Sequence, residues 1–141
     1  MKNALFVASL LVISTCGVAA PVSPDHPIVG TWQVLAPGTA CTETYTFRKN
    51  GTKRSQSAGE IQESKFAISS KPSAAGYYKL TDTVVESNDK LDCSGSSTPV
   101  GDTVSVFVRF EQGLKVFSFC YTEAKDKCVG PFKRTAGRAS P

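Results

Sequence analysis

Short segments of alternating polarity, each ended by turn residues, follow one another from residue 28 to residue 134 of this chain. Val104, Val106 and Val108 occupy every second position of one segment, and no stretch keeps a helical period. Because side chains alternate between the two faces of a strand, this pattern indicates strands with one face toward a core. The pattern predicts eight strands, at Gly30–Leu35, Thr42–Arg48, Thr52–Ser57, Ile61–Ser69, Tyr77–Glu86, Thr103–Phe110, Leu114–Tyr121 and Lys127–Arg134.

The connections between these segments are short and rich in turn residues. Asn50-Gly51 is the strongest hairpin signal, because a type I′ turn requires positive φ at both central residues. The loop Glu111–Gly113 ends in a glycine suited to a left-handed position, and Asn88–Lys90 and Ser94–Gly101 supply two more breaks. Strands joined mainly by tight turns form an up-and-down sheet, and closure removes its exposed edges. We therefore predict an all-β fold, a small up-and-down antiparallel β-barrel.

The length of 141 residues and the hydrophobic content of 40% suit one folded domain. A formal charge of +4 is too small to predict a nucleic-acid partner. The single histidine, His26, cannot form a histidine-rich metal site, and no cofactor motif is present, so we predict neither metal nor cofactor. We divide the chain into a signal peptide (1–19), a proline-rich linker (20–28) that contains a solvated His26, the barrel (29–135) and a disordered tail (136–141).

The first residues have the layout of a secretory leader. A short positive start, Met1–Asn3, precedes an apolar run, Ala4–Ile13, that is too short to span a bilayer, and small residues follow. We favour Gly17–Ala19 as the cleavage triplet, because cleavage after Ala20 would place a proline directly after the bond. Cys16 offers an alternative, since the residues before it resemble a bacterial lipobox. We expect a secreted or periplasmic bacterial protein without a transmembrane segment; the alternative is an outer-membrane lipoprotein anchored at Cys16.

Four cysteines follow the leader, an even number without the spacing of a metal or redox motif. In an exported chain this predicts two disulfides, and four cysteines allow three pairings. We favour Cys120–Cys128, because the polar segment between them resembles a turn that would place the two residues opposite each other on neighbouring strands. Cys41–Cys93 then follows by elimination.

Two predicted strands offer apolar side chains on a single face. Such side chains either line a cavity for a small ligand or fill a solid core, and the sequence pattern is the same in both cases. The ligand-binding candidates are Tyr45, Phe47, Val104, Val106, Val108 and Phe110.

Two further groups of residues are candidates for a contact surface. A row of aromatic residues shares one face of a strand whose other face is also apolar, so this row is either covered by another segment or exposed. Basic residues flank the Asn50-Gly51 turn, either as a contact for an anionic partner or as a solvated turn that discourages edge pairing. The interaction-surface candidates are Arg48, Lys49, Lys53, Arg54, Phe117, Phe119 and Tyr121.

Gly30-Thr31-Trp32 opens the first predicted strand, and Lys133-Arg134 closes the last. With the eight-strand pattern, these residues resemble the calycin superfamily, and within it short bacterial lipocalin-like secreted proteins. The resemblance implies a calycin-like barrel without the C-terminal helix of lipocalins. It also implies structural roles at the barrel base for Gly30, Trp32 and Arg134, with the basic side chain packed across the indole.

The first predicted function is that of a lipocalin-like binding protein for a small apolar or amphipathic ligand. The alternative is an envelope or host-facing protein-interaction module, of inhibitor or adhesin type, without a small ligand. We do not predict an enzyme and name no catalytic residue, because no nucleophile or phosphate-binding motif appears and no carboxylates form a recognisable pair. Glu60 and Glu63, for example, have opposite parity on one strand.

Overall fold

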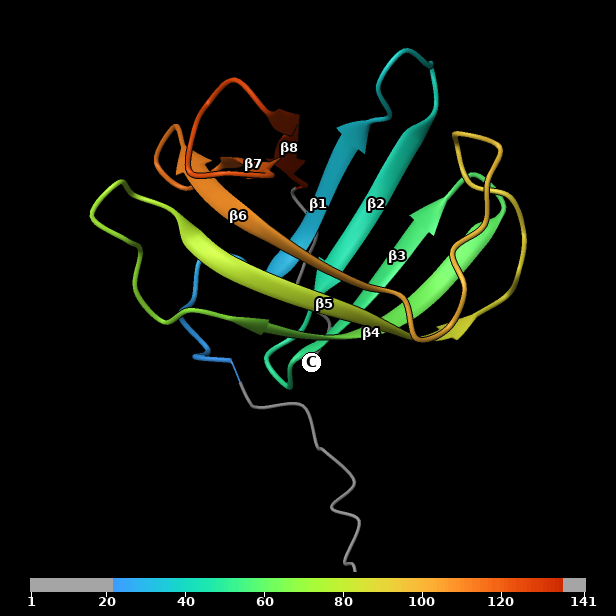
Figure 1. Ribbon diagram of the computed structural model, residues 1–141, viewed down its shortest axis with the longest axis horizontal. Helices are drawn as coiled ribbons and strands as arrows, with labels where there is room; N and C mark the ends of the chain where they lie inside the picture. Colours follow the sequence, from blue (N-terminus) through green and yellow to red (C-terminus); the bar gives the residue numbers. More distant parts are fainter. Residues whose placement is uncertain (1–21, 136–141) are drawn as a thin grey trace, which may run out of the picture.

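The computed structural model describes residues 22–135, which form a closed antiparallel barrel of eight strands (Figure 1). The predicted signal peptide (1–19), the alternative anchor Cys16 and the predicted tail (136–141) lie outside the described residues. The strands are β1 (Gly30–Leu35), β2 (Thr42–Phe47), β3 (Thr52–Ser57), β4 (Glu60–Ile68), β5 (Tyr78–Ser87), β6 (Thr103–Glu111), β7 (Val116–Cys120) and β8 (Cys128–Arg134).

The barrel is an up-and-down meander in which each strand pairs with its neighbours in sequence and β8 closes on β1. The predicted all-β fold and its eight-strand antiparallel barrel are therefore confirmed. The β1–β2, β3–β4, β5–β6 and β7–β8 connections lie at one end, which we call the open end (Figure 1). The other three connections and residues 22–29 lie at the opposite end, which we call the closed end.

The hairpin at Asn50-Gly51 is present, but its turn is not the predicted type I′. Gly51 has a φ of 77°, whereas Asn50 is not among the residues with positive φ. The backbone N–H of Arg48 donates to Thr52 O, and the N–H of Gly51 donates to Arg48 O, at 2.9 and 3.1 Å. This is a three-residue loop with one left-handed glycine, in which the Asn50 side chain accepts from the Thr52 N–H instead of adopting positive φ.

The apolar core fills the closed end of the barrel. The rings of Phe117 and Phe132 stack with centroids 4.6 Å apart, and Trp32 meets Phe117 edge to face at 4.7 Å. Large apolar side chains from β1, β2, β4, β5, β6, β7 and β8 converge here because each occupies an inward position near the same end of its strand. Those with at most 2% of their surface exposed, together with one residue before β1, are Ile28, Trp32, Phe47, Phe66, Leu80, Val108, Phe117 and Phe132.

Residues 22–28 pack against the closed end and do not form the solvated linker that we predicted for residues 20–28. Val22 and Ile28 are buried, and His26 is 5% exposed. Nδ1 of His26 accepts a hydrogen bond from the Ile28 N–H at 3.1 Å, so Nε2 carries the proton and donates to Ser69 O at 3.2 Å. The prediction of a solvated His26 failed because the prolines of this segment set extended turns without preventing the side chains between them from packing.

Arg134 lies across Trp32, the contact that the calycin resemblance implies. The guanidinium carbon is 4.1 Å from the indole centroid, and its nitrogens donate to Val29 O and Pro27 O. Trp32 Nε1 donates to Ile28 O at 2.8 Å. A Cβ on residue 30 would clash with Arg134 Nη1, and the φ of +134° is one that residues with a side chain rarely adopt, so the position requires glycine.

Both favoured cysteine pairs form disulfides. Cys120 and Cys128 lie directly opposite each other on β7 and β8, with Cα atoms 4.0 Å apart. Cys41 and Cys93 join the β1–β2 and β5–β6 connections across 52 residues of sequence. Both bonds lie at the open end, and two disulfides are consistent with an oxidising environment. Within residues 22–135, no helix is long and apolar enough to cross a membrane.

Candidate functional site

The interior of the barrel becomes polar toward the open end. The buried side chains of β3 are Lys53, Ser55 and Ser57, and β4 continues the polar lining with Glu60 and Gln62. The outward residues of β3 are also polar, so this strand has no apolar face. Polar groups removed from bulk water require partners, and those partners come from other inward residues of the barrel.

A buried ion pair crosses this polar interior. The Lys53 ammonium on β3 donates to Asp82 Oδ2 on β5, and only 9% and 7% of the two side chains are exposed. Lys53 Nζ also lies 5.5 Å from the centroid of the Tyr45 ring. The second carboxylate oxygen, Asp82 Oδ1, is buried and has no hydrogen-bond partner within the described part of the chain. The pair is therefore incompletely satisfied, which is costly for a buried charge.

Glu43 and Tyr45 form a second polar group on β2. The Tyr45 hydroxyl donates to Glu43 Oε2 at 2.9 Å, and Ser57 Oγ donates to Glu43 Oε1 at 2.6 Å. Burial raises the pKa of the Tyr45 hydroxyl, and the charges of Glu43, Asp82 and Glu60 raise it further. Tyr45 therefore remains a neutral hydrogen-bond donor at physiological pH.

Two adjoining hollows occupy the open end. One, of about 250 Å³, is mainly apolar and is lined by residues that include Phe47, Leu80, Val106, Phe119 and Val129. The other, of about 190 Å³, is mainly polar and includes the β3 and β4 residues described above. Both hollows share the lining residues Tyr45, Lys53, Asp82 and Val104. The open end thus combines an apolar half and a polar half around one buried ion pair, and we call this the amphipathic cavity.

The long β5–β6 connection, residues 88–102, contributes to the polar half. The backbone N–H of Thr98 donates to Glu60 Oε1 at 2.7 Å, and Gln62 Nε2 donates to Thr98 O at 3.3 Å. Cys93 fixes the same connection through the disulfide to Cys41, and its N–H donates to Ser57 Oγ. The position of this connection over the open end therefore depends on one disulfide and a few hydrogen bonds.

The structure divides the predicted ligand-binding residues into two groups. Tyr45, Phe47, Val104 and Val106 line the amphipathic cavity, with Val104 at its mouth and 46% exposed. Val108 is fully buried in the apolar core, and Phe110 packs against that core, so neither lines the cavity.

The sequence analysis did not identify the polar half of the cavity. The β3 segment, which has polar residues on both faces, signalled it, because such a strand is stable only if its inward face meets water, a ligand or polar partners. The lining residues that sequence analysis missed are Glu43, Ser55, Ser57, Glu60, Gln62, Leu80, Asp82, Val84, Asp92, Thr98, Asp102 and Val129.

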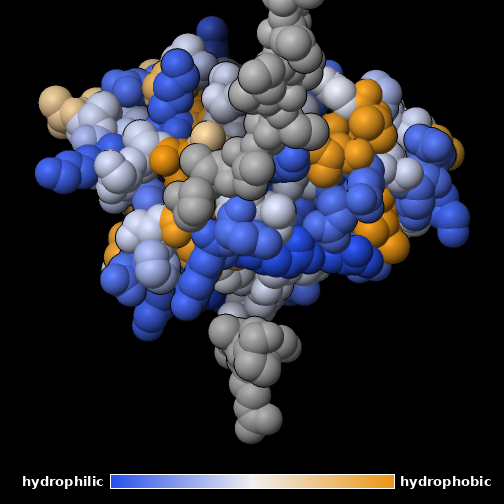
Figure 2. Space-filling view, turned by 90° about the horizontal axis from the view of Figure 1, so that it is seen from below, coloured by the Kyte–Doolittle hydropathy of each residue, from blue (hydrophilic) through white to orange (hydrophobic). Residues whose placement is uncertain are grey.

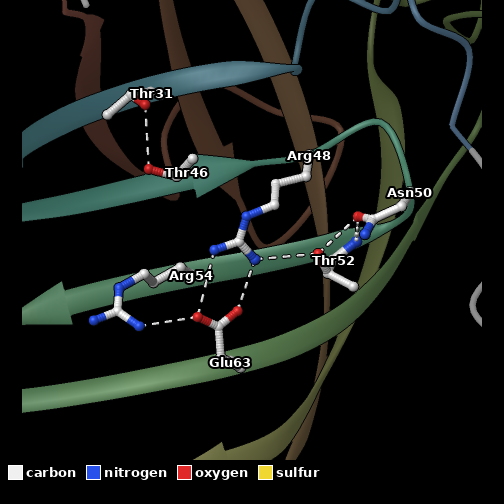
Figure 3. Close-up of polar contacts among 7 residues, drawn as sticks. All are labelled: Thr31, Thr46, Arg48, Asn50, Thr52, Arg54 and Glu63. Carbon is white, nitrogen blue, oxygen red and sulfur yellow. Dashed lines mark hydrogen bonds and ion pairs between the residues drawn. The ribbon is translucent and has the colours of Figure 1, made fainter. Parts of the chain in front are cut away.

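The predicted basic turn is only partly neutralised, because two of its arginines share one carboxylate. Arg48 and Arg54 both donate to the Glu63 carboxylate, at 2.8 and 3.0 Å (Figure 3). The hydrogen bond from Arg48 lowers the pKa of Glu63, and Arg54 lowers it further against the opposing effect of burial. Lys53 points into the barrel, so its assignment to the surface was wrong; strand parity places it beside Ser55 on the inward face. Of the four predicted basic residues, Lys49 alone takes part in none of the ion pairs of the described residues, and it is exposed.

The predicted aromatic row is also divided by the structure. Phe117 is completely buried in the core, and Phe119 packs partly buried against it, whereas Tyr121 is 64% exposed. A register shift between Phe117 and Phe119 in the β7–β8 pairing disturbs the simple alternation on which the row was based. The row is therefore covered over most of its length, which was one of the two alternatives left open.

The outer surface shows fewer features of a binding site than the barrel interior. On the face seen in Figure 2, hydrophilic residues predominate and hydrophobic residues form several separate groups. A hollow of about 750 Å³ lies at the seam of β1 and β8, where only Trp32–Arg134 and Gln33–Lys133 pair. Two buried side-chain atoms of the described residues, Ser64 Oγ and Asp82 Oδ1, lack a hydrogen-bond partner, and neither residue lines this hollow. Residues 22–135 contain no cluster of metal-binding side chains.

The chain matches no protein-family model, no curated protein and no solved structure. Its function must therefore be argued from the amphipathic cavity itself.

Proposed function

We propose that this protein binds a small amphipathic ligand in the amphipathic cavity. The observation that carries the proposal is the buried Asp82 carboxylate, which has one oxygen on Lys53 and a second oxygen without a partner among the described residues, and which lines both hollows. A bound polar group that donates a hydrogen bond would reduce the cost of that unpartnered oxygen. A filled core needs neither the unpartnered oxygen nor the space.

The dimensions of the cavity support a small ligand. Its apolar and polar hollows measure about 250 and 190 Å³, against roughly 300–1,000 Å³ for typical drug-sized sites. Phe47, Leu80 and Val106 would remove an apolar group from water, while the Lys53–Asp82 pair would orient a polar group. The ligand therefore has a short apolar part joined to a polar end.

Export to the periplasm or the medium of a bacterium is part of the same proposal. The predicted leader supports it, and the two disulfides are compatible with an oxidising compartment. A lipocalin-like classification rests on the resemblance at Gly30, Trp32 and Arg134, and lipid attachment at Cys16 is the alternative mode of export. We do not propose catalysis.

The alternative function, a protein-interaction module of inhibitor or adhesin type, retains less support. Arg48 and Arg54 of its basic turn share the single Glu63 carboxylate, Lys53 points into the barrel, and Phe117 is buried. Lys49, Arg54 and Tyr121 of the predicted surface are exposed, and Lys49 and Tyr121 lie at opposite ends of the barrel. The exposed basic and aromatic residues of the predicted set therefore do not form one contiguous anchor for a partner.

Native mass spectrometry of the protein isolated without denaturation tests the binding function. We expect a defined excess mass that is lost on denaturation. A Val104→Trp variant should lose this mass, because the larger side chain blocks the mouth of both hollows. The matched control is Val85→Trp, which alters a 37% exposed valine outside the cavity lining. An unliganded mass for the native protein would contradict the proposal.

A further inference from the structure

The polar half of the amphipathic cavity has an excess of acidic groups. Its lining contains one ammonium group, that of Lys53, and five carboxyl groups. The formal charge of this lining is −4, although the whole chain has a formal charge of +4. The carboxyl groups belong to Glu43, Glu60, Asp82, Asp92 and Asp102.

Internal partners do not neutralise this excess. Lys53 forms an ion pair with Asp82 and with no other carboxylate of the described residues. Asp82 Oδ1 still has no partner among these residues, although only 7% of the Asp82 side chain is exposed. Glu43 accepts hydrogen bonds from two hydroxyl groups, and Glu60 accepts one from a backbone N–H; both kinds of partner are uncharged. Asp102 is exposed at the rim. The lining is therefore short of positive charge, and the deficit includes a buried acceptor.

From this charge distribution, together with the unpartnered Asp82 oxygen, we infer that the polar end of the ligand is a cation, so that the cavity selects small amphipathic amines. The inference rests on the proposed binding function and specifies its ligand class. An ammonium group donates up to three hydrogen bonds and accepts none, which matches a lining rich in acceptors. A carboxylate would place another negative charge among five, and an alcohol would gain no charge attraction.

The aromatic residues of the cavity add a second attraction for a cation. Tyr45 and Tyr121 both line the apolar half, and an ammonium group near the face of a tyrosine ring is attracted by its electrons. Lys53 already uses the Tyr45 ring in this way at 5.5 Å. Burial is the main cause of the raised pKa of Tyr45, and the negative charges of Glu43, Asp82 and Glu60 raise it further.

Three probes of equal chain length test the inference: hexylamine, hexan-1-ol and hexanoate. Their binding is measured by isothermal titration calorimetry at pH 7. We expect hexylamine to bind at least tenfold more tightly than hexan-1-ol, and hexanoate most weakly. Equal or tighter binding of the alcohol or the acid would overturn the inference and leave the binding function intact. If none of the three binds, the inference also fails, while native mass spectrometry judges the binding function separately.

Conservative variants locate the selectivity. Glu60→Gln keeps an oxygen for the Thr98 N–H but removes the charge, and Asp102→Asn removes a charge at the exposed rim. Each should reduce the amine-to-alcohol affinity ratio several-fold. The matched control is Glu86→Gln, an exposed carboxylate outside the cavity lining, which should leave the ratio unchanged. An unchanged ratio in Asp102→Asn, which alters no buried group, would count against the inference even if Glu60→Gln failed to fold.

Discussion

Lys53 and Asp82 join β3 to β5 across the interior of the barrel, with β4 between the two strands. The contact lies where the apolar core ends and the polar half of the cavity begins, because both hollows include both residues. It is the one buried ion pair among the described residues. Its energetic role can be separated from its role in ligand binding.

Breaking this pair from one side should destabilise the protein. Lys53→Met leaves the Asp82 carboxylate buried without its cation, and loss of one partner of a buried pair typically costs about 3–5 kcal/mol. The double variant Lys53→Met/Asp82→Leu should be much closer to the native stability, because no buried charge remains. Urea unfolding of Lys53→Met, Asp82→Leu and the double variant measures their free energies of unfolding. A double variant as unstable as Lys53→Met would show that the pair contributes through packing rather than through charge.

Gly30→Ala should destabilise the closed end by roughly 1–3 kcal/mol, the usual cost of one strained backbone position. The new methyl group would clash with Arg134 Nη1, and the φ of +134° is unfavourable for alanine. Gly38→Ala is the control, since Gly38 also has positive φ (+72°) but nothing lies within 4 Å of its Cβ position. Thermal unfolding of both variants separates the clash from the conformational cost. Equal losses would mean that the Arg134 contact does not require glycine.

Stability should fall as the pH falls below the range of an ordinary histidine. Burial lowers the pKa of His26 below 6.5, against the opposing hydrogen bond to Ser69. The unfolded chain therefore takes up the proton first, so stability is complete above about pH 6.5 and is lost as the pH falls through the folded-state pKa. The slope can reach about 1.4 kcal/mol per pH unit. Urea unfolding between pH 7.5 and 5.5 measures it.

The comparison protein for that titration is His26→Gln, which keeps a side-chain amide for Ser69 O but does not ionise. Because the chain has no other histidine, the variant should lose most of the pH dependence in this window. If the unfolding free energy of the native protein and of the variant changed equally with pH, His26 would not be the group that titrates.

Strand existence was predictable because the local pattern and the tertiary environment agree. Val104, Val106 and Val108 alternate with outward residues, and β6 has the same inward face in the structure. The contact of Trp32 with Arg134 at the barrel base, beside Gly30, was also predictable, because the calycin resemblance implies it. The boundaries differ from prediction by at most two residues.

The polar half of the cavity was not predictable from binary patterning. Lys53 was assigned to the surface because a lysine beside a turn is usually solvated, and its buried partner Asp82 is 29 residues away. The alternation of side chains along a strand places Lys53 on the same face as Ser55 and Ser57. Because every residue of β3 is polar, however, the pattern does not indicate which face is inward. His26 was misjudged for a related reason, because its partner Ser69 is 43 residues away in sequence.

The disulfide between Cys41 and Cys93 should matter for the cavity as well as for stability. Its loop of 52 residues corresponds to about 4 kcal/mol in the chain-entropy account, whereas the eight-residue loop of Cys120–Cys128 corresponds to about 2.5 kcal/mol. In Cys41→Ser/Cys93→Ser, residues 88–102 lose their covalent attachment over the open end, so their amides should exchange hydrogen faster and ligand affinity should fall. The control is Cys120→Ser/Cys128→Ser, which should leave exchange in residues 88–102 unchanged. Equal exchange in both variants would mean that the hydrogen bonds of Glu60 and Gln62 to Thr98 hold this connection without the disulfide.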